Sequence, residues 1–251
     1  MLIALAAAVI FCALAWFKKW LDAGGALAAA IIGVIILLSG GWQLALPMLL
    51  FFMSGSLFGK LPAYSVIDSA KTKKPRDFVQ VLSNGGIAAV CLLFYLFTKN
   101  QVFVTAYFFS IAICTSDTWS SELGLFFKGE VIDIISLKKI PKGLSGGISL
   151  MGTLAGLVGA ALIALLYLLL FTNKWQTALL ITAGGFAGML LDSMIGSWFQ
   201  AVYRLENGVR AEEKVPGEAA VLEKGFGWMT NDLVNLLSNL VITVLWIWQM
   251  R

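Results

Sequence analysis

Eight long apolar segments follow one another along the chain. Hydrophobic residues make up 59% of its 251 residues and charged residues 13%, a composition typical of integral membrane proteins. Because a membrane-spanning helix needs about 20 apolar residues, the pattern predicts an all-α bundle of about eight transmembrane helices. Residues 1–251 are expected to form a single transmembrane domain. The segments lie at residues 2–17, 24–39, 42–59, 78–98, 102–121, 144–171, 175–199 and 228–249.

Basic residues are divided unevenly between the loops that join these segments. If the N-terminus lies outside, 15 of the 18 Lys and Arg residues fall in cytoplasmic loops, and the exceptions are Lys99, Lys174 and Arg251. The positive-inside rule therefore predicts that both termini are outside, in a multi-pass protein of the cell membrane (the plasma or inner membrane). None of the 14 acidic residues falls on the outer side. We expect the function to lie at the cytoplasmic face.

Two of the inner loops are long enough to form structure of their own. Residues 127–136 and 203–214 are expected to form small hairpins. The second contains an Asn207-Gly208 step, which suits a type I′ turn because that turn needs a positive φ at both central residues.

Scarce residue types exclude several kinds of function. The chain has no histidine, which excludes histidine-based acid–base catalysis and histidine metal sites. Its three cysteines, Cys12, Cys91 and Cys114, lie inside apolar segments at unrelated spacings. They are interpreted as packing residues rather than as a disulfide framework or a zinc site. A nucleic-acid partner is not expected.

The segment at 102–121 ends in polar residues that hydrocarbon does not accommodate. Asp117 and Glu122 lie there among several hydroxyl residues. A carboxylate at the centre of a bilayer costs roughly 2.5–3.5 kcal/mol on insertion scales, so it usually faces a polar interior and serves a function. Alternatively, Asp117 lies in the headgroup layer and caps the helix. Similar polar groups at the same depth in four other segments favour the functional interpretation.

A polar helix face and a basic cluster mark the start of the segment at 78–98. Asp77, Gln80 and Asn84 are spaced to share one face of a helix. The basic residues alone could serve to attract anionic lipid, but that interpretation does not account for an asparagine one or two turns inside the membrane. The basic cluster consists of Lys73, Lys74 and Arg76.

A glycine-rich stretch opens the segment at 144–171. Backbone N–H groups at such a helix start can converge on an anion, and Lys142 adds a full positive charge. For the later Gly152, Gly156 and Gly159 we prefer a packing seam of small residues. The residues expected to bind phosphate here are Lys142, Gly143, Ser145, Gly146, Gly147 and Ser149.

The last two segments also carry acids and amides. Asp192 and Gly196 are one helical turn apart, so a ligand can approach the acid closely. Asp232, Asn235 and Asn239 lie along one stripe of the final segment. Such a stripe could instead hold helices together by hydrogen bonds.

Oxygen ligands beside an anion-binding loop are the groups that hold a magnesium–nucleotide complex. The membrane location indicates that the second substrate is a lipid. The expected Mg²⁺ ligands are Asp117, Glu122, Asp192 and Asp232. Further residues expected to contact nucleotide or phosphate are Asn84, Asn235, Lys60 and Lys74.

In this order the motifs resemble those of the membrane phytyl-phosphate kinase family of the vitamin E pathway, whose bacterial and animal relatives mostly have no assigned function. The resemblance extends over nearly the whole chain. It rests on Arg76-Asp77 with Gln80 and Ser83-Asn84-Gly85-Gly86, Ser116-Asp117-Thr118-Trp119 with Glu122-Leu123-Gly124, Gly143 with Ser145-Gly146-Gly147, Ser149 and Gly152-Thr153, Gly188 with Leu191-Asp192-Ser193, Gly196 and Gln200, and Asn231-Asp232 with Val234-Asn235.

The resemblance implies transfer of a phosphoryl group from CTP, or another nucleoside triphosphate, to an isoprenyl monophosphate, with Mg²⁺ as cofactor. It implies that Asp117, Asp192 and Arg76 are catalytic. The absence of histidine fits this reaction, because a phosphomonoester with a second pKa near 6 is already ionised and needs no general base.

Other functions stay open on the sequence alone. A prenol kinase or a CTP-dependent lipid transferase could use the same lipid and nucleotide. An ion- or proton-coupled transporter would also bury acids, but its site should lie near the midplane with access from both sides. Here the outer half of every segment is apolar. A lipid-binding protein without catalytic activity would not need so many carboxylates beside a glycine-rich loop.

Overall fold

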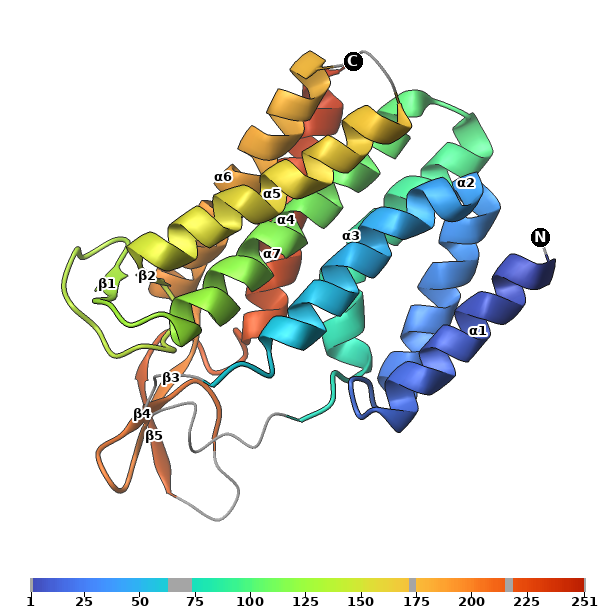
Figure 1. The fold of residues 1–251 in the computed structure, drawn as a ribbon. Helices are drawn as coiled ribbons and strands as arrows, with labels where there is room; N and C mark the ends of the chain where they lie inside the picture. Colours follow the sequence, from blue (N-terminus) through green and yellow to red (C-terminus); the bar gives the residue numbers. More distant parts are fainter. Residues whose placement is uncertain (1, 63–73, 172–174, 215–218, 251) are drawn as a thin grey trace.

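The computed structural model describes residues 2–62, 74–171, 175–214 and 219–250. In these residues the chain forms a bundle of helices that lie side by side, with short strands gathered at one end (Figure 1). Six of the helices are long and apolar enough to cross a membrane, which confirms the predicted class of polytopic helical membrane protein. The helices are α1 (Leu2–Phe17), α2 (Ala23–Phe58), α3 (Phe78–Thr98), α4 (Gln101–Phe126), α5 (Leu150–Leu170), α6 (Trp175–Phe199) and α7 (Asn231–Gln249).

Helix α2 is interrupted in its middle by two glycines. Neither Gly40 nor Gly41 has helical backbone angles, and Gly41 has a φ of +62°. A Cβ atom on Gly25 would lie 2.3 Å from the Arg76 carbonyl oxygen, and one on Gly55 would lie 2.9 Å from Arg76 Nη2. A straight helix would separate these two glycines by about 45 Å, so the chain must turn back at the glycine pair.

The number of membrane crossings depends on this reversal. The predicted count of eight requires the two halves of α2 and the 16-residue helix α1 to cross separately. That count stays a prediction, whereas the six long apolar helices are observed. The sequence placed the break between segments at the same Gly40-Gly41 pair.

Helix α4 is the most deeply buried helix of the bundle. It packs against α2, α3, α5, α6 and α7, and every residue from Tyr107 to Ser116 is buried. The polar residues that follow in the same helix are therefore surrounded by neighbouring helices. Asp117 lies in the helix interior rather than at its cap, because α4 continues to Phe126.

The glycines of α5 let that helix approach the backbone of α4. Cβ atoms on Gly152, Gly156 and Gly159 would lie between 2.7 and 3.2 Å from carbonyl oxygens of α4. Side chains larger than hydrogen would therefore push the two helices apart. The predicted packing seam is confirmed at these three positions.

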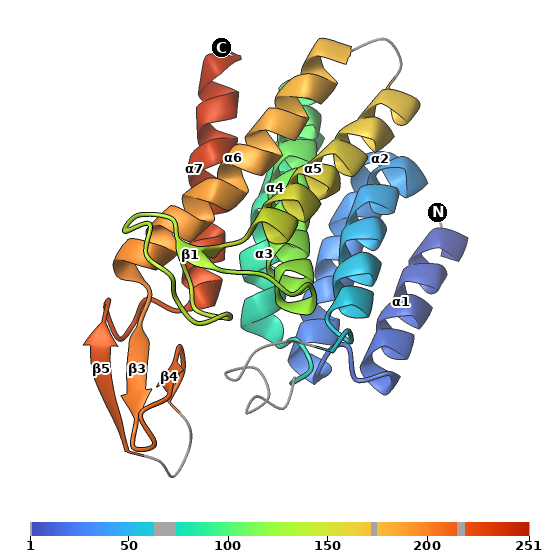
Figure 2. The ribbon, with the colours of Figure 1, turned by 60° about the vertical axis from the view of Figure 1, so that its left-hand side comes forward.

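The strands belong to the long loops. Strands β1 (Ile132–Asp133) and β2 (Gly147–Ile148) form an antiparallel pair, and β3 (Val202–Leu205) lies between β4 (Arg210–Ala211) and β5 (Ala220–Lys224) in an antiparallel sheet. Both sheets lie at the same end of the bundle (Figure 2).

Two details of the predicted hairpins are wrong. The main partner of β1 is β2, which follows residues 127–136, so that stretch does not form a hairpin of its own. The second hairpin exists as β3 and β4, but of its turn residues Gly208 has a positive φ and Asn207 does not. A type I′ turn needs both, and here a longer turn with one left-handed glycine takes its place.

The polar and apolar ends of the bundle match the charge pattern of the sequence. Both termini lie at helix ends that point away from the strands (Figure 1). The loops around Lys18, Lys139 and Arg210 lie at the strand end together with the start of α3. Assigning that end to the cytoplasm follows from the positive-inside rule.

Candidate functional site

A narrow crevice lies between α3, α4, α6 and α7, in the half of the bundle nearer the strands. It is too narrow to hold a water molecule. Each of the four helices contributes polar groups to it, including two carboxylates. We call it the carboxylate crevice. It is lined by Asn84, Ile113, Cys114, Asp117, Asp192, Asn235 and Ser238.

Asp192 is held from one side by α7. Its side chain is 7% exposed, and its Oδ2 accepts a hydrogen bond from Ser238 Oγ at 2.9 Å. The Asn235 amide, in the orientation that satisfies its partners, donates to the same oxygen at 3.0 Å and to the Asn231 carbonyl at 3.2 Å. Within the described residues no donor reaches Asp192 Oδ1, so one carboxylate oxygen is left for another partner.

Asp117 lies across the crevice on α4 and is half-buried. It repels Asp192 electrostatically, and Glu122 repels Asp117 in turn. In the described part of the chain no group donates a hydrogen bond to Asp117. Two neighbouring carboxylates with little solvent repel each other strongly. A cation bound between them would offset this repulsion.

The donor set fits Mg²⁺ bound together with a phosphate ligand. Magnesium is usually held by one or two carboxylates, with substrate phosphates and water completing its six positions. Asp117 and Asp192 supply that number. Among the described residues no cluster of three or more acidic, histidine or cysteine side chains forms a complete protein metal site, so further ligands would have to come from the substrate.

A second charged cluster surrounds the end of α2. A Cβ atom on Gly55 would lie 2.9 Å from both Arg76 Nη2 and Thr118 Cγ2, and one on Gly59 would lie 3.4 Å from Glu122 Oε1. Arg76 and Glu122 attract each other electrostatically. The two glycines therefore make room for a cation and an acid beside α4, one turn beyond Asp117.

The backbone of Arg76 is fixed before its side chain enters this cluster. Its N–H donates to the Trp20 carbonyl at 3.1 Å, and its carbonyl accepts from Asp22 at 3.0 Å. The guanidinium lies over the Phe52 ring at 5.6 Å. Burial lowers the pKa of Arg76, and the charge of Glu122 acts in the opposite direction. The predicted catalytic cation is thus placed at the edge of the acidic cluster.

Asp232 lies apart from the carboxylate crevice. It is in the first turn of α7, where it interacts with the Ser83 hydroxyl and is repelled by Asp77 and Glu213. The structure therefore brings together two of the four predicted metal ligands, places Glu122 beside the pair, and does not place Asp232 with them.

The amide residues of the predicted set have different surroundings. Asn84 lines the crevice, and its Nδ2 donates to the Gln80 carbonyl at 3.0 Å. Asn239 is fully buried and donates to the Ser110 carbonyl at 3.3 Å and to Cys114 Sγ at 3.0 Å. These bonds tie α7 to α4, which agrees with the interpretation of Asn239 as a residue that holds helices together.

The glycine-rich loop before α5 is anchored at both ends. Gly143 has a φ of +88°, which few residues other than glycine adopt. The Lys142 ammonium donates to the Gly124 carbonyl at 3.2 Å and also to the Phe127 carbonyl, at the end of α4. Ser149 caps α5 by accepting a hydrogen bond from Gly152 N at 3.1 Å. Lys142 and Ser149 therefore have structural partners besides their predicted role.

The middle of this loop packs against α6 around a well-satisfied acid. A Cβ atom on Gly146 would lie 2.4 Å from Ser197 Cβ. Asp133 accepts hydrogen bonds from Ser197 Oγ and Ser136 N, both at 2.6 Å, and from Ile135 N at 3.2 Å. Burial raises the pKa of Asp133, but these hydrogen bonds outweigh it and the net shift is downward.

Glu212 is a site residue that the sequence did not reveal. Its carboxylate accepts a hydrogen bond from the Ser145 backbone N–H in the glycine-rich loop, and its charge acts on Asp192. A Cβ atom on Gly196 would lie 2.0 Å from Ser145 Oγ, so this glycine allows the loop to approach α6. The Glu212 carboxylate therefore already accepts a hydrogen bond from a backbone N–H of the loop that was predicted to bind phosphate.

The two remaining lysines that were predicted to contact nucleotide or phosphate, Lys60 and Lys74, do not line the carboxylate crevice. The Lys60 ammonium lies over the Trp20 ring at 5.0 Å. Lys74 is exposed in the segment that precedes α3. Lys73 lies outside the described residues.

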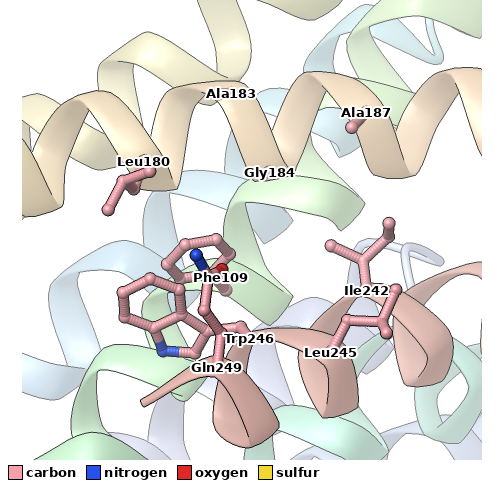
Figure 3. Close-up of a pocket in the computed structure, with 9 residues that line it drawn as sticks. All are labelled: Phe109, Leu180, Ala183, Gly184, Ala187, Ile242, Leu245, Trp246 and Gln249. Carbon is pink, nitrogen blue, oxygen red and sulfur yellow. The ribbon is translucent and has the colours of Figure 1, made fainter.

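A larger, apolar groove lies farther from the strands, between α4, α6 and α7. Its volume is about 270 Å³. In Figure 3, Leu180 of α6 and Leu245 of α7 line it from two sides, with Phe109 of α4 between them. We call it the α6–α7 groove. Its lining consists of Phe109, Leu180, Ala183, Gly184, Ala187, Ile242, Leu245, Trp246 and Gln249.

Fold and site together define a polytopic helical membrane protein with paired carboxylates enclosed near one end of the bundle. The chain belongs to the family described as integral membrane protein DUF92, whose pattern matches residues 6–243. This finding confirms the membership that the motifs predicted.

Three curated relatives illustrate the breadth of that family. An uncharacterised membrane protein of Methanocaldococcus jannaschii is 36% identical, over 79% of this chain and 84% of the relative. Protein PGR of Arabidopsis thaliana is 29% identical, over 91% and 88%. The chloroplastic protein VTE6 of the same plant is 25% identical, over 87% and 62%. No solved structure matches the chain.

Proposed function

We propose that the protein is a membrane-embedded kinase that transfers a phosphoryl group from CTP, or another nucleoside triphosphate, to an isoprenyl monophosphate. The reaction takes place at the cytoplasmic face of the plasma or inner membrane. The observation that carries the proposal is the Asp117–Asp192 pair, because no hydrogen-bond donor among the described residues reaches Asp117 or the Oδ1 atom of Asp192, and Arg76 and the glycine-rich loop lie nearby. The resemblance to the phytyl-phosphate kinase family supports it.

In this mechanism an oxygen of the lipid monophosphate attacks the γ-phosphorus of the nucleotide. The bond from that phosphorus to the bridging oxygen breaks, and the nucleoside diphosphate leaves with the bridging oxygen. Magnesium held by Asp117 and Asp192 would supply neutralising charge to the phosphates. Proximity and electrostatic stabilisation provide most of the catalysis in phosphoryl transfer.

The other side chains orient the reacting groups. Asn235 and Ser238 fix Asp192 Oδ2, so its other oxygen points to the ligand. The Arg76 guanidinium offsets the charge of the incoming phosphate. The Ser145 N–H, now bonded to Glu212, is a backbone donor for the nucleotide phosphates when Glu212 moves away. Because the crevice has no room for a water molecule in this structure, the helices that line it would have to separate for phosphate to enter, and we propose that the lipid then approaches from the bilayer between α6 and α7.

A prenol kinase is the nearest competing function, because Asp117 has no described hydrogen-bond donor and could act as a base toward an alcohol. An alcohol acceptor is almost fully protonated at pH 7 and needs such a base. A monophosphate acceptor needs cations instead. We assign this role to Arg76, Lys60 and Lys74, which lie in the segments next to the ends of α2 and α3.

Competition between geranylgeranyl monophosphate and geranylgeraniol tests the proposal. Purified protein in detergent, with Mg²⁺ and CTP, should phosphorylate the monophosphate at least ~100-fold more efficiently, which corresponds to about 2.7 kcal/mol of transition-state discrimination. Product chromatography gives the ratio. Equal turnover would favour a prenol kinase, and no turnover with any nucleoside triphosphate would overturn the kinase assignment.

A further inference from the structure

The α6–α7 groove lies next to the carboxylate crevice along the same helices. Along α4 the lining passes from Ile113 of the crevice to Phe109 of the groove, one helical turn away. Along α7 it passes from Ser238 to Ile242, again one turn. Along α6, Ala187 of the groove lies five residues before Asp192, about 7.5 Å along the axis. Helices α4, α6 and α7 therefore line both the crevice and the groove, and α3 contributes to the crevice alone, which lies nearer the strands.

Small residues on α6 create the depth of the groove. Gly184 packs so tightly on Phe109 that a Cβ atom there would lie 2.3 Å from Phe109 Cε1. The Phe109 ring stacks on Trp246 at a centroid distance of 4.2 Å, which gives the groove a rigid aromatic floor. Ala183 and Ala187 are exposed on its α6 side and leave space that larger side chains would fill.

The chemistry of the lining changes along its length. Eight of the nine lining residues are apolar or glycine, and the polar one, Gln249, lies near the C-terminal end of α7, farthest from the crevice. A molecule that fits crevice and groove together has a charged head toward the strands and a hydrocarbon tail toward the opposite end of the bundle. That is the form of a phosphorylated lipid.

We propose that the α6–α7 groove binds the hydrocarbon tail of the lipid substrate and sets its preferred chain length. This inference rests on the proposed function, because it takes the carboxylate crevice as the place of the phosphate head. A cavity of 150 Å³ binds benzene, so the groove volume of about 270 Å³ corresponds to on the order of ten carbon atoms, or about two isoprene units. The groove thus distinguishes long prenyl chains from a chain of one isoprene unit, which ends before reaching it.

Ala187→Phe tests this inference, because it fills the groove from an exposed position without displacing a buried side chain. The matched control is Ala161→Phe, at an exposed position of α5 that does not line the groove. Dimethylallyl and geranylgeranyl monophosphate compete as substrates, and chromatography gives the ratio of the two diphosphates.

Ala187→Phe should lower the preference for the longer chain at least ~10-fold while turnover of dimethylallyl monophosphate, whose five-carbon chain ends before the groove, stays unchanged. Ala161→Phe should leave both values as in the wild type. An unchanged ratio in Ala187→Phe, or an equal loss for both substrates, would overturn the assignment of the groove.

A binding readout separates this inference from the kinase proposal. Geranylgeranyl monophosphate with a photoreactive group at its tail should label peptides from residues 183–187 and 242–249, and unlabelled geranylgeranyl monophosphate should compete with the labelling. Such labelling in a protein without kinase activity would refute the proposed reaction and retain the tail site. Labelling spread over the outer faces of α5 and other helices, without competition, would overturn the tail site itself.

Discussion

A single buried acid, Asp133, and the acidic pair Asp117–Asp192 lie in the half of the bundle nearer the strands and have opposite surroundings. Asp133 is 4% exposed and accepts hydrogen bonds from Ser197 and from the backbone at Ser136. Asp192 has donors on one oxygen, and Asp117 has none in the described residues. Asp133 therefore has hydrogen-bond partners within the protein, whereas the carboxylates of Asp117 and Asp192 repel each other.

The contrast separates a structural acid from functional ones. A satisfied buried carboxylate fixes a loop, because removing it would leave its donors without partners. A buried pair without sufficient donors lowers the stability of the folded chain and is expected where a ligand supplies the missing charge. Asp133 therefore anchors the glycine-rich loop to α6, whereas the Asp117–Asp192 pair is the place where we propose that a cation binds together with phosphate.

The largest expected effect comes from removing one charge of the pair. Asp117→Asn or Asp192→Asn should lower kcat/KM for the prenyl monophosphate at least ~1,000-fold, about 4 kcal/mol, because the cation loses a ligand. The melting temperature should stay the same or rise, since repulsion is relieved and Ser238 can still donate to an asparagine at 192. If a variant instead folds poorly but its folded fraction keeps the activity of the wild type, the pair has a structural role and not a catalytic one.

Asp133→Ala should have the opposite effect and lower the stability of the protein without a large loss of activity. The change leaves the buried Ser197 hydroxyl without an acceptor and removes the acceptor of the Ser136 N–H, at a cost of roughly 1–3 kcal/mol, or about 2–12 °C in melting temperature. Activity of the folded protein should remain within a few-fold of the wild type. Thermal unfolding and turnover of the same sample check both points, and Asp133→Asn, which keeps an acceptor oxygen, is the matched control.

Arg76→Ala sharpens the comparison at the edge of the pair. The monophosphate acceptor loses a nearby cation, so its advantage over the alcohol should fall about tenfold, or ~1.4 kcal/mol. Lys99→Ala removes a positive charge at the opposite end of the bundle and should leave the ratio unchanged. If the two substitutions change the ratio equally, Arg76 does not contact the acceptor.

Glu212→Gln should have the smallest effect. Its carboxylate bonds to Ser145 N–H and adds negative charge near Asp192, so the substitution should lower KM for the nucleotide by about two- to threefold with kcat unchanged. Steady-state kinetics at saturating lipid measures this effect. A tenfold rise in KM would show instead that Glu212 holds part of the nucleotide site.

The sequence predicted the features that depend on local pattern. Apolar length indicated the helices, the Gly40-Gly41 pair marked the break within α2, and the spacing of Gly152, Gly156 and Gly159 indicated a packing seam. Each of these signals comes from residues within a few turns of one another. The polar depth of Asp117 and Asp192 also predicted that both would line the bundle interior, because hydrocarbon excludes carboxylates.

Contacts between distant segments could not be predicted in this way. Glu212 meets Ser145 only because the β3–β4 hairpin folds back onto the glycine-rich loop. Asp232 had the same sequence signal as Asp192, yet the start of α7 directs it to Ser83 of α3. The partner of β1 is β2, which residues 127–136 do not contain. Which side chains meet in a bundle depends on helix rotation and on loop paths, and neither leaves a periodic pattern in the sequence.

Thermal unfolding with Mg²⁺ and CTP tests most directly whether the unsatisfied pair, and not the satisfied acid, binds the cation and nucleotide. At ligand concentrations about 100-fold above Kd, binding should raise the melting temperature of the wild type by about 5–10 °C. The shift should disappear in Asp117→Asn and Asp192→Asn and persist in Asp133→Asn. An equal shift in all four proteins would contradict this assignment of the carboxylate crevice.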